Sequence, residues 1–428
     1  MRECVSAWVM SSQTIPAHSS TAGLTQRHRD TGDQAWPDSA LTHSRTHALT
    51  HFPLHLARLH LRNYRNFAEQ ELEIPPQGVA IIGDNGQGKT NLLEAIYYLE
   101  IFRSFRGAPD EQLVRFGEEV FRVEGTLRGD DGAERKLAAA FERRRKKKKV
   151  TVGGAEPERL GDALGKVGAV IFSPSDVEIV AGGPGERRRF LDIVLSLAEP
   201  GYLGALQRYR QALFQRNTLL RQGSPATLVE LWNDPLVAAG SRVLEARARW
   251  VADRAESFAA HYARVAGGQP GTLALAPSVE LGDGAPSVDT ISAAFRDKLS
   301  RVAEREQRRG MTLAGPHRDD LRFATHAPDG TALELRTYGS GGQQRTAAIA
   351  LRMVEAETIR QTRGRESVIL LDDVFAELDP GRSQRIVEWI EGEEGGQVIL
   401  TSPKPTDFHV HGDTLPRWTI RNGVVSPL

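Results

Sequence analysis

Residues 79–91 read Val79-Ala-Ile-Ile-Gly-Asp-Asn-Gly-Gln-Gly-Lys-Thr-Asn91, and this segment combines three structural signals. Four apolar residues predict a buried strand, a glycine-rich turn follows them, and a helical pattern runs from Asn91 to about Glu100. A G-x-x-x-x-G-K-[ST] turn between a strand and a helix is typical of a phosphate-binding loop. The predicted nucleotide-binding residues, named the phosphate loop below, are Gly83, Asp84, Asn85, Gly86, Gln87, Gly88, Lys89 and Thr90.

Each residue type in this loop has a chemical reason. Glycines let successive backbone N–H groups turn toward phosphate oxygens, and the N-terminus of the following helix favours negative charge. Lys89 is expected to reach the β- and γ-phosphates, and the Thr90 hydroxyl is expected to bind Mg²⁺. A chance glycine turn is the alternative in a chain with 41 glycines, but chance rarely supplies both the strand and the helix that flank it.

A second apolar strand supplies the acidic residues that a phosphate loop requires. Residues 367–373 read Ser367-Val-Ile-Leu-Leu-Asp-Asp373. Asp372 is expected to coordinate Mg²⁺, and Asp373 is expected to orient and deprotonate the attacking water, so Asp373 and Lys89 are the predicted catalytic residues. A strand ending in two aspartates says little alone, because many strands end in a turn-forming aspartate. Together with the phosphate loop it predicts a nucleotide-hydrolysis site.

Composition limits the remaining possibilities. Lys and Arg together number 55, and Asp and Glu together also number 55, so any basic surface must be local. Cys4 is the only cysteine, which excludes an intrachain disulfide and a cysteine-based metal site and fits a reducing compartment. No run of residues approaches the ~18 apolar positions that span a bilayer. We therefore expect a cytoplasmic protein without a membrane segment.

One basic run stands out in this neutral chain. It lies between two predicted strands, Lys136–Phe141 and Val150–Val152. Most charge runs are solvated loop tips, which is the first interpretation. Clustered Lys and Arg are also the electrostatic signature of nucleic-acid binding, which is the second. The candidate DNA-binding residues are Arg143, Arg144, Arg145, Lys146, Lys147, Lys148 and Lys149.

Composition and periodicity also divide the chain. Residues 1–53 are rich in Ser, Thr, His and Gln, and we expect them to be a disordered extension. Residues 54–190 and 311–428 are expected to form an α/β ATPase lobe, with residues 191–310 inserted as a helical lobe that is too short for a long coiled coil. The predicted strands are Leu54–Leu61, Glu71–Ile74, Phe121–Leu127 and Val167–Phe172, and the predicted lobe helices are Leu203–Leu220, Val229–Val265 and Ile291–Arg308.

A third motif precedes an amphipathic helix at about residues 346–362. It reads Tyr338-Gly-Ser-Gly-Gly-Gln-Gln-Arg345. A flexible turn capping a helix is the structural alternative, but with the two other motifs in order Ser340, Gly341, Gly342 and Gln343 resemble the signature motif of ABC-type ATPases. In that superfamily the signature contacts the γ-phosphate held by a second subunit. The resemblance therefore implies a P-loop NTPase head of the ABC type and an ATP-dependent homodimer.

Spacing indicates which branch of that superfamily is similar. Ser340 lies 251 residues after Lys89, whereas transport ATPases place their signature about a hundred residues after this lysine. Transport ATPases also carry a histidine after the next strand, where this chain has Thr401-Ser402-Pro403. The chain resembles instead the RecF family of SMC-like ATPases over residues 54–428. The resemblance rests on Leu61-Arg-Asn-Tyr-Arg-Asn66, Arg103-Ser-Phe-Arg106, Phe172-Ser-Pro174, Gly185-Glu-Arg-Arg-Arg-Phe-Leu-Asp192, Gly315-Pro-His-Arg-Asp-Asp-Leu321, Gly342-Gln-Gln-Arg-Thr346 and Leu371-Asp-Asp-Val-Phe-Ala-Glu-Leu-Asp379.

The resemblance implies a function in recombinational DNA repair and replication restart. The expected cofactors are ATP and Mg²⁺, with slow, DNA-dependent hydrolysis. The expected partners are single-stranded and duplex DNA, gap junctions, a second copy of the chain, RecR and RecO, with recombinase loading and SOS induction as the outcome. An ATPase subunit of an ABC transporter and a non-hydrolysing nucleotide-dependent scaffold are the alternatives.

Two further expectations concern single positions. Ala376 stands where the family commonly has serine, which implies weaker signalling between subunits through that loop. The segment Gly315–Leu321 could be mistaken for a metal or acid–base cluster because it contains His317, Asp319 and Asp320. We expect it to be a turn whose polar groups are satisfied internally.

Overall fold

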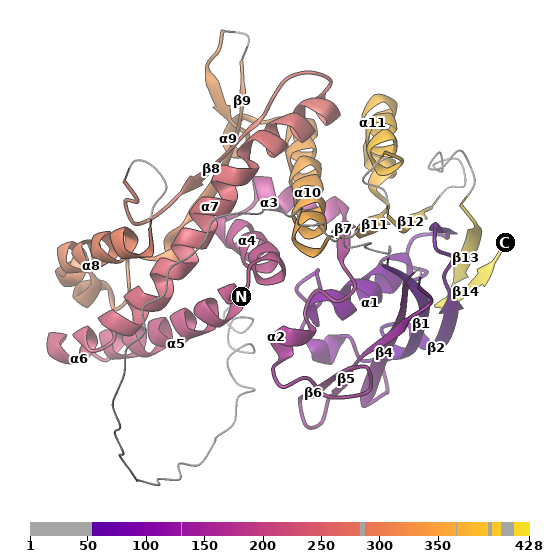
Figure 1. Cartoon of the computed structure of the whole chain (residues 1–428), viewed down its shortest axis with the longest axis horizontal. Helices are drawn as coiled ribbons and strands as arrows, with labels where there is room; N and C mark the ends of the chain where they lie inside the picture. Colours follow the sequence, from indigo (N-terminus) through magenta and orange to yellow (C-terminus); the bar gives the residue numbers. More distant parts are fainter. Residues whose placement is uncertain are drawn as a thin grey trace, which may run out of the picture. The chain divides into compact units, whose positions relative to one another are not determined.

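A computed structural model gives the fold of the main part of the chain (Figure 1). The predicted disordered extension lies outside the described residues. None of the helices in the described ranges is long and apolar enough to cross a membrane. The structure describes residues 54–129, 131–282, 287–327, 329–364, 366–392, 396–403 and 415–428.

A six-stranded sheet forms the centre of the molecule, in the order β14-β13-β3-β12-β11-β7. Strands β3, β12, β11 and β7 pair in parallel and are buried along almost all of their length, which explains why they read as continuous apolar runs rather than alternating patterns. The strands that were predicted from residues 79–82, 167–172 and 367–373 are confirmed. The bounds are β3 Gly78–Ile82, β7 Ala169–Phe172, β11 Val368–Asp372, β12 Val398–Ser402, β13 Arg417–Arg421 and β14 Val424–Pro427.

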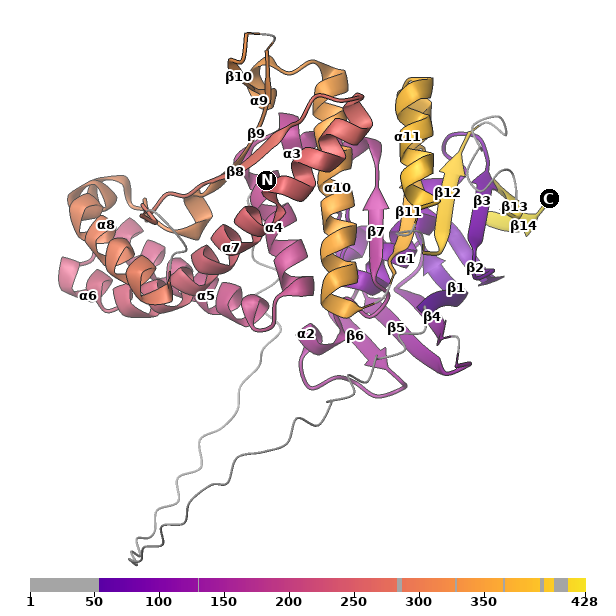
Figure 2. The same cartoon turned by 45° about the horizontal axis from the view of Figure 1, so that its top comes forward.

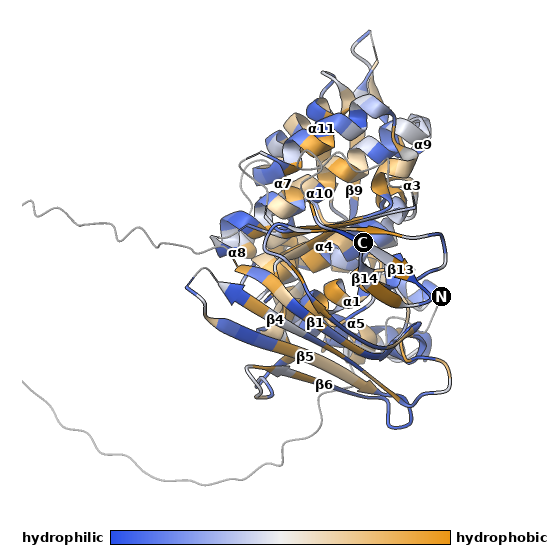
Figure 3. Ribbon diagram, turned by 90° about the vertical axis from the view of Figure 1, so that its right-hand side faces the viewer, coloured by the Kyte–Doolittle hydropathy of each residue, from blue (hydrophilic) through white to orange (hydrophobic). Residues whose placement is uncertain are grey.

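A second, antiparallel sheet has the order β2-β1-β4-β5-β6. Buried and exposed residues alternate along parts of β1 and β4, as expected for a sheet with one face on the core and one toward water. Figure 3 shows that hydrophilic and hydrophobic residues alternate along parts of these strands. The bounds are β1 Leu54–Tyr64, β2 Phe67–Glu73, β4 Val120–Gly129, β5 Glu134–Glu142 and β6 Lys147–Val152.

Helix α1, Lys89–Ile101, lies between the two sheets (Figure 1). Almost every residue from Leu92 onward in α1 is buried, so the helix has no solvent-facing stripe. Its apolar side chains join residues of both sheets in one hydrophobic core. The phosphate loop at its start is therefore anchored to the best-packed part of the molecule.

Residues 191–310 are mainly helical. The predicted helices at 203–220 and 291–308 are confirmed. The helix predicted at 229–265 is confirmed from Asn233 onward, whereas Val229 and Glu230 end the separate helix α6; α7 is the longest described helix at 34 residues. A short three-stranded sheet, β10-β9-β8, accompanies them. The helices are α4 Pro184–Ala198, α5 Tyr202–Arg221, α6 Ala226–Glu230, α7 Asn233–Ala266 and α8 Val288–Arg309, and the strands are β8 Thr272–Ala276, β9 Asp320–His326 and β10 Ala332–Glu334.

The remaining elements connect the lobes. Helix α10 leads back to the central sheet and α11 follows β11 (Figure 2). Two features cross the lobe boundaries expected from the sequence: α4 continues through 190/191, and β8 pairs with β9 across 310/311. The helices are α2 Leu160–Ala163, α3 Val177–Ala181, α9 Leu335–Tyr338, α10 Gly341–Arg363 and α11 Pro380–Ile390, and the 3₁₀ turns are Asp110–Gln112, Pro174–Asp176, Pro316–Arg318 and Val374–Glu377.

The segment Gly315–Leu321 is a turn with internally satisfied polar groups, as predicted. His317 Nε2 contacts the Thr312 carbonyl at 3.0 Å, and burial lowers the pKa of His317 to about 4. Asp319 forms an ion pair with the buried Arg247 at 2.9 Å. These groups are therefore occupied in joining the lobes and are not free for catalysis.

Gln397 joins the two sheets and offers a test of the fold. Its buried amide accepts a hydrogen bond from Leu56 N–H at 2.9 Å and donates to the carbonyls of Leu56 and Pro75 at 3.0 and 2.8 Å. Gln397→Leu leaves these backbone groups buried without partners, so we expect a loss of about 3 kcal/mol in the free energy of unfolding.

Urea denaturation of Gln397→Leu measures this loss. Gln361→Leu is the matched control, because Gln361 is exposed and, among the described residues, its side chain bonds Glu357 alone, one turn away. An equal and small effect of both substitutions would contradict the role of Gln397.

Candidate nucleotide-binding site

The phosphate loop lies between β3 and α1, as the sequence predicts. Gly86 and Gly88 have φ angles of +83° and +114°, a region that glycine adopts without strain. Gly88 is the N-cap of α1, and no side chain caps this helix or places an acid in its first turn. The first N–H groups of α1 are therefore available to an anion.

Lys89 is buried and lies over the loop. Its Nζ donates to the carbonyl of Gly83 at 2.8 Å and lies 3.3 Å from Asn85 Oδ1. It also forms an ion pair with Asp373 at 3.4 Å. The structure thus brings together the two residues that were predicted to be catalytic, although they are separated by most of the chain.

Thr90 and Asp372 also meet. Thr90 Oγ1 donates to Asp372 Oδ1 at 2.9 Å. These two oxygens are hard ligands of the kind Mg²⁺ prefers, and Mg²⁺ is commonly bound by only one or two protein oxygens together with phosphate and water. Within the described ranges no group of three or more His, Cys, Asp or Glu side chains could hold a metal. The residues therefore fit a magnesium ion that shares its ligands with a nucleotide.

Thr401 is a member of the site that the sequence interpretation missed. Its hydroxyl lies 3.3 Å from both Asp372 Oδ1 and Asp373 Oδ1, and the N–H of Asp373 donates to the same hydroxyl at 3.2 Å. Thr401 lies next to the last residue of β12, which pairs directly with β11. A polar residue at the end of the next apolar strand was the available signal.

Asp373 has an unusual backbone conformation. Its φ is +49°, in the left-handed region that non-glycine residues seldom adopt. It follows the last residue of β11, and this conformation begins the turn Val374–Glu377. The strained turn accompanies the placement of the carboxylate against Lys89, and strain of this kind is common at functional sites.

The signature residues begin α10. Ser340 is its N-cap: the Gln343 N–H donates to Ser340 Oγ at 3.2 Å, and Ser340 N–H donates to Gln343 Oε1 at 2.8 Å. Ser340 and Gly341 are exposed. In Figure 2, α9, which leads into Ser340, and β3, which leads into the phosphate loop, lie on opposite sides of α11. The structure describes no contact between the signature residues and the phosphate loop.

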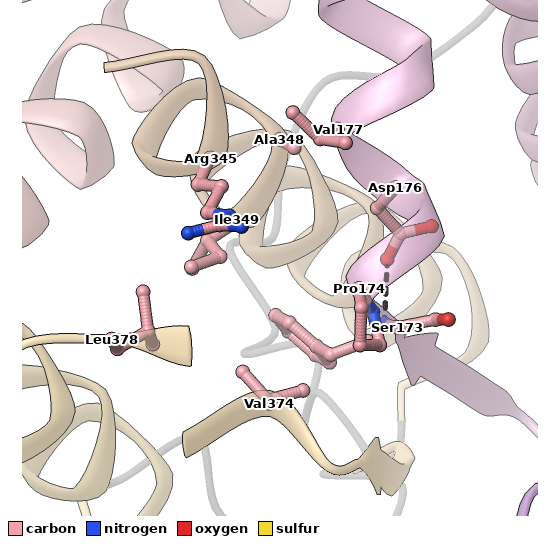
Figure 4. A pocket seen from close by; sticks show the side chains of 10 residues that line it. Ser173, Pro174, Asp176, Val177, Arg345, Ala348, Ile349, Val374 and Leu378 are labelled. Atoms are coloured by element: carbon pink, nitrogen blue, oxygen red, sulfur yellow. Dashed lines mark hydrogen bonds between the residues drawn. The ribbon is translucent and has the colours of Figure 1, made fainter. Parts of the chain in front are cut away.

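Helix α10 is fixed to the end of β7 by buried charges. Arg352 forms ion pairs with Asp176 and Glu355, each at 2.6 Å. Asp176 also accepts a hydrogen bond from Ser173 N–H at 2.8 Å, drawn in Figure 4. A small pocket lies beside this junction, where the end of β7, α10 and the turn after β11 meet. Its lining is Phe172, Ser173, Pro174, Asp176, Val177, Arg345, Ala348, Ile349, Val374 and Leu378.

Two members of the basic run have structural partners. Arg143 Nη2 donates to the carbonyls of Glu111 and Val114 at 3.1 Å each. Lys148 forms an ion pair with Asp110 at 2.8 Å and lies over the Tyr98 ring, and burial lowers its pKa. These two side chains hold the β5–β6 hairpin to the segment that follows α1.

The other members of the run are more exposed. Arg145, Lys146 and Lys149 form ion pairs with nearby glutamates. Within the part of the chain that the structure describes, Arg144 and Lys147 have no ion pair. Arg144 and Lys147 are therefore the members of the run most open to an external phosphate.

The Asp372 carboxyl generates a pH-dependent prediction. Burial, assisted by the charge of Asp373, raises the pKa of Asp372 to about 6. Above pH 6 the folded state must hold this carboxylate ionised at a cost that the unfolded chain does not have, and the cost shrinks as the pH falls through 6. Asp372→Asn should therefore stabilise the nucleotide-free protein by about 1 kcal/mol more at pH 8 than at pH 5. Urea denaturation at both pH values measures the difference, and an equal effect at both would argue against a raised pKa.

Comparison with known proteins agrees with this geometry. The family described as RecF/RecN/SMC N terminal domain matches residues 55–426. The DNA replication and repair protein RecF of Synechococcus sp. strain JA-2-3B'a(2-13) is 38% identical, over 82% of this chain and 91% of that protein. RecF of Oceanobacillus iheyensis is 35% identical, over 87% of this chain and 100% of that protein.

Solved structures give the same result. The recombination mediator protein RecF-ATP of the RecFOR pathway has a TM-score of 0.80 at 30% identity and covers 89% of this chain and 100% of its own. The Smc head domain of Pyrococcus furiosus, with a TM-score of 0.50 at 16% identity, covers 88% of this chain and 96% of its own and supports the fold alone. The predicted ABC-type ATPase head is confirmed, and the chain belongs to the RecF family.

Proposed function

We propose that this protein is an ATP-dependent DNA-binding protein of recombinational DNA repair and replication restart. The observation that carries the proposal is the convergence of Lys89, Thr90, Asp372 and Asp373 at the ends of three neighbouring strands and the start of α1. Relatives named as DNA replication and repair proteins support the DNA part of the proposal. A RecF structure named with ATP supports the choice of nucleotide.

The residues of the site have separable tasks in this proposal. The phosphate loop N–H groups and the Lys89 ammonium bind the phosphates of ATP. Thr90 and Asp372 would hold Mg²⁺, which would neutralise charge on the phosphates. Lys89 now pairs with Asp373, so a phosphate that attracts Lys89 leaves the Asp373 carboxylate free to accept a proton from the attacking water. Slow, DNA-dependent turnover is the expected result.

The exposed start of α10 supports a site shared between two copies of the chain. Ser340 and Gln343 bond each other, and Ser340 and Gly341 are exposed. A helix N-terminus that is exposed and carries a serine can contact a phosphate held by a second protomer. ATP would then favour the dimer because it binds this state preferentially.

Ser340→Arg tests the shared site. The substitution should leave ATP binding intact but block the ATP-dependent dimer, because a long side chain replaces the residue that faces the partner's nucleotide. Lys89→Ala should lose both ATP binding and dimerisation. Sedimentation velocity with and without ATP and Mg²⁺, together with a titration of ATP, measures both properties.

The matched control is Ser287→Arg, since Ser287 caps α8 through the same reciprocal hydrogen bonding. It should dimerise like the unmodified protein. A Ser340→Arg protein that still dimerises with ATP would disprove the shared site, and a Lys89→Ala protein that binds ATP normally would disprove the nucleotide site itself.

The basic run Arg143–Lys149 is the proposed DNA contact. Arg144 and Lys147 are exposed, whereas Arg143 and Lys148 bond to the segment after α1. The double substitution Arg144→Ala, Lys147→Ala should therefore weaken duplex DNA binding without loss of fold. Its plot of log affinity against log salt should become shallower by about 0.9 for each phosphate that the protein no longer neutralises.

Fluorescence anisotropy over a range of salt concentrations measures this slope. The double substitution Arg301→Ala, Arg305→Ala on α8 removes the same charge from another exposed surface and serves as the control. If both variants keep the original slope, the run is a solvated loop tip.

The remaining parts of the proposal come from the family. RecR and RecO as partners, gap junctions as a substrate, recombinase loading and SOS induction are implied by the family resemblance. The RecFOR pathway named for one solved structure supports the two partners. The transporter alternative has no such support. A non-hydrolysing scaffold shares the ATP site and differs only in whether Asp373 completes the reaction.

A further inference from the structure

The β13–β14 hairpin contacts the phosphate loop directly. Its turn is Asn422–Gly423. The N–H of Gly423 donates to the carbonyl of Gln87 at 3.0 Å, and the N–H of Asn422 donates to Gln87 Oε1 at 2.7 Å. Residues more than three hundred positions apart are thereby joined through both the backbone and the side chain of Gln87.

A second segment bonds the same carbonyl. Asn66, in the turn between β1 and β2, donates from Nδ2 to the Gln87 carbonyl at 2.9 Å. Its Oδ1 accepts a hydrogen bond from Asn91 Nδ2 at 2.8 Å, in the first turns of α1. Asn66 therefore links the end of the phosphate loop to the start of the helix that follows it.

The packing around these contacts leaves no room for larger residues. A Cβ added to Gly88 would lie 2.5 Å from Asn66 Nδ2, and one added to Gly423 would lie 2.7 Å from the Asn66 carbonyl oxygen. Gly423 and Asn422 have φ angles of +76° and +49°, the pair of left-handed residues that a tight Asn-Gly hairpin turn requires. The Asn-Gly sequence of the turn and its close approach to Asn66 therefore both favour the observed position of the hairpin against the phosphate loop.

The hairpin also holds the other end of the loop and is itself anchored. A Cβ added to Gly83 would lie 2.6 Å from both Ile420 Cγ2 and the Ile420 carbonyl oxygen, so β13 lies directly against the first residue of the loop. On β14, the Val425 N–H donates to Gln70 Oε1 at 2.9 Å. Gln70 belongs to β2, and the hairpin is therefore fixed to the antiparallel sheet.

These contacts set the direction of one peptide group. In a trans peptide the carbonyl of one residue and the N–H of the next point in opposite directions. The Gly423 N–H and Asn66 Nδ2 both donate to the Gln87 carbonyl, which therefore points away from the inside of the phosphate loop. The N–H of Gly88 consequently points to the inside of the loop, where phosphate is proposed to bind. Glycines at Gly86 and Gly88 give the loop many other accessible conformations, which these contacts exclude.

We propose that Asn66 and the turn Asn422–Gly423 are positioning residues of the nucleotide site, which hold the phosphate loop in the conformation that binds ATP. The inference rests on the proposed nucleotide binding by Gly83–Thr90, and it adds three residues outside every motif that was assigned to nucleotide chemistry from the sequence. The two strands of the β13–β14 hairpin therefore have a functional role at the ATP site, besides their structural role at the edge of the central sheet.

Asn66→Asp and Gly423→Ala test the proposal. Aspartate has the shape of asparagine and keeps the acceptor for Asn91, but it cannot donate to the Gln87 carbonyl. Alanine at 423 pushes the turn away from Asn66. Each should weaken ATP binding about tenfold, since roughly one buried hydrogen bond to the loop is removed or misdirected. Calorimetric titration with ATP and Mg²⁺ measures the affinity, and thermal unfolding without nucleotide measures stability.

Gly330→Ala is the control for strain at a positive φ. Gly330 has a φ of +83°, lies in the β9–β10 turn, and has open space where its Cβ would be. Its alanine variant should lose stability but bind ATP as the unmodified protein does. If Asn66→Asp and Gly423→Ala also bind ATP normally, the proposal is overturned.

Two further outcomes are informative. Should Gly423→Ala fail to fold, the Asn66→Asp result alone still decides, because that substitution changes no volume. Failure of the unmodified protein to bind ATP would instead refute the nucleotide site on which the inference rests. If Gly330→Ala, at the same loss of thermal stability, loses as much ATP affinity as Asn66→Asp and Gly423→Ala, the three residues only stabilise the fold and the proposal is overturned.

Discussion

The parallel pairing of β12 with both β3 and β11 is the constraint on which the rest of the site depends. Because Leu400 lies beside Ala80 on one side and Leu371 on the other, the ends of the three strands come to one edge of the sheet. That edge receives the phosphate loop from β3 and the two aspartates from β11. A shift of one residue in either register would separate Thr90 from Asp372, since neighbouring side chains of a strand face opposite sides.

Local patterns made the main features of the fold predictable. The phosphate loop, the Asp372–Asp373 strand and the start of α10 each combine a motif with a flanking element inside about twenty residues, so the sequence alone located them. The helices of the inserted lobe were equally accessible, because their apolar residues recur with the period of a helix. The resemblance to a known family then led to the hypothesis that Ser340 contacts the nucleotide bound by a second copy of the chain, which no single segment of the sequence indicates.

The features that were missed are all contacts between distant segments. The Arg352–Asp176 pair carries no local signal, because its role follows from which helix lies on the sheet. Thr401 follows an apolar run that is visible in the sequence, but its contact with the two aspartates depends on strand order. The basic run shows the same limit in reverse. Its seven charges look equivalent in the sequence, yet Lys148 is half-buried against Asp110 while its neighbour Lys147 on β6 is exposed, because strand alternation turns successive side chains to opposite faces.

The strand order of the central sheet has a consequence for synthesis of the protein on the ribosome. Strand β3 begins at residue 78, but its two neighbours are β12 and β13, which begin at residues 398 and 417. The emerging chain must therefore wait for more than three hundred further residues before β3 finds either partner, about 15 to 70 seconds at typical bacterial elongation rates. During that interval an apolar strand has two unpaired edges. This chain consequently has a long period of exposure to aggregation and to chaperones, and the nucleotide site can form only after β12 has left the ribosome.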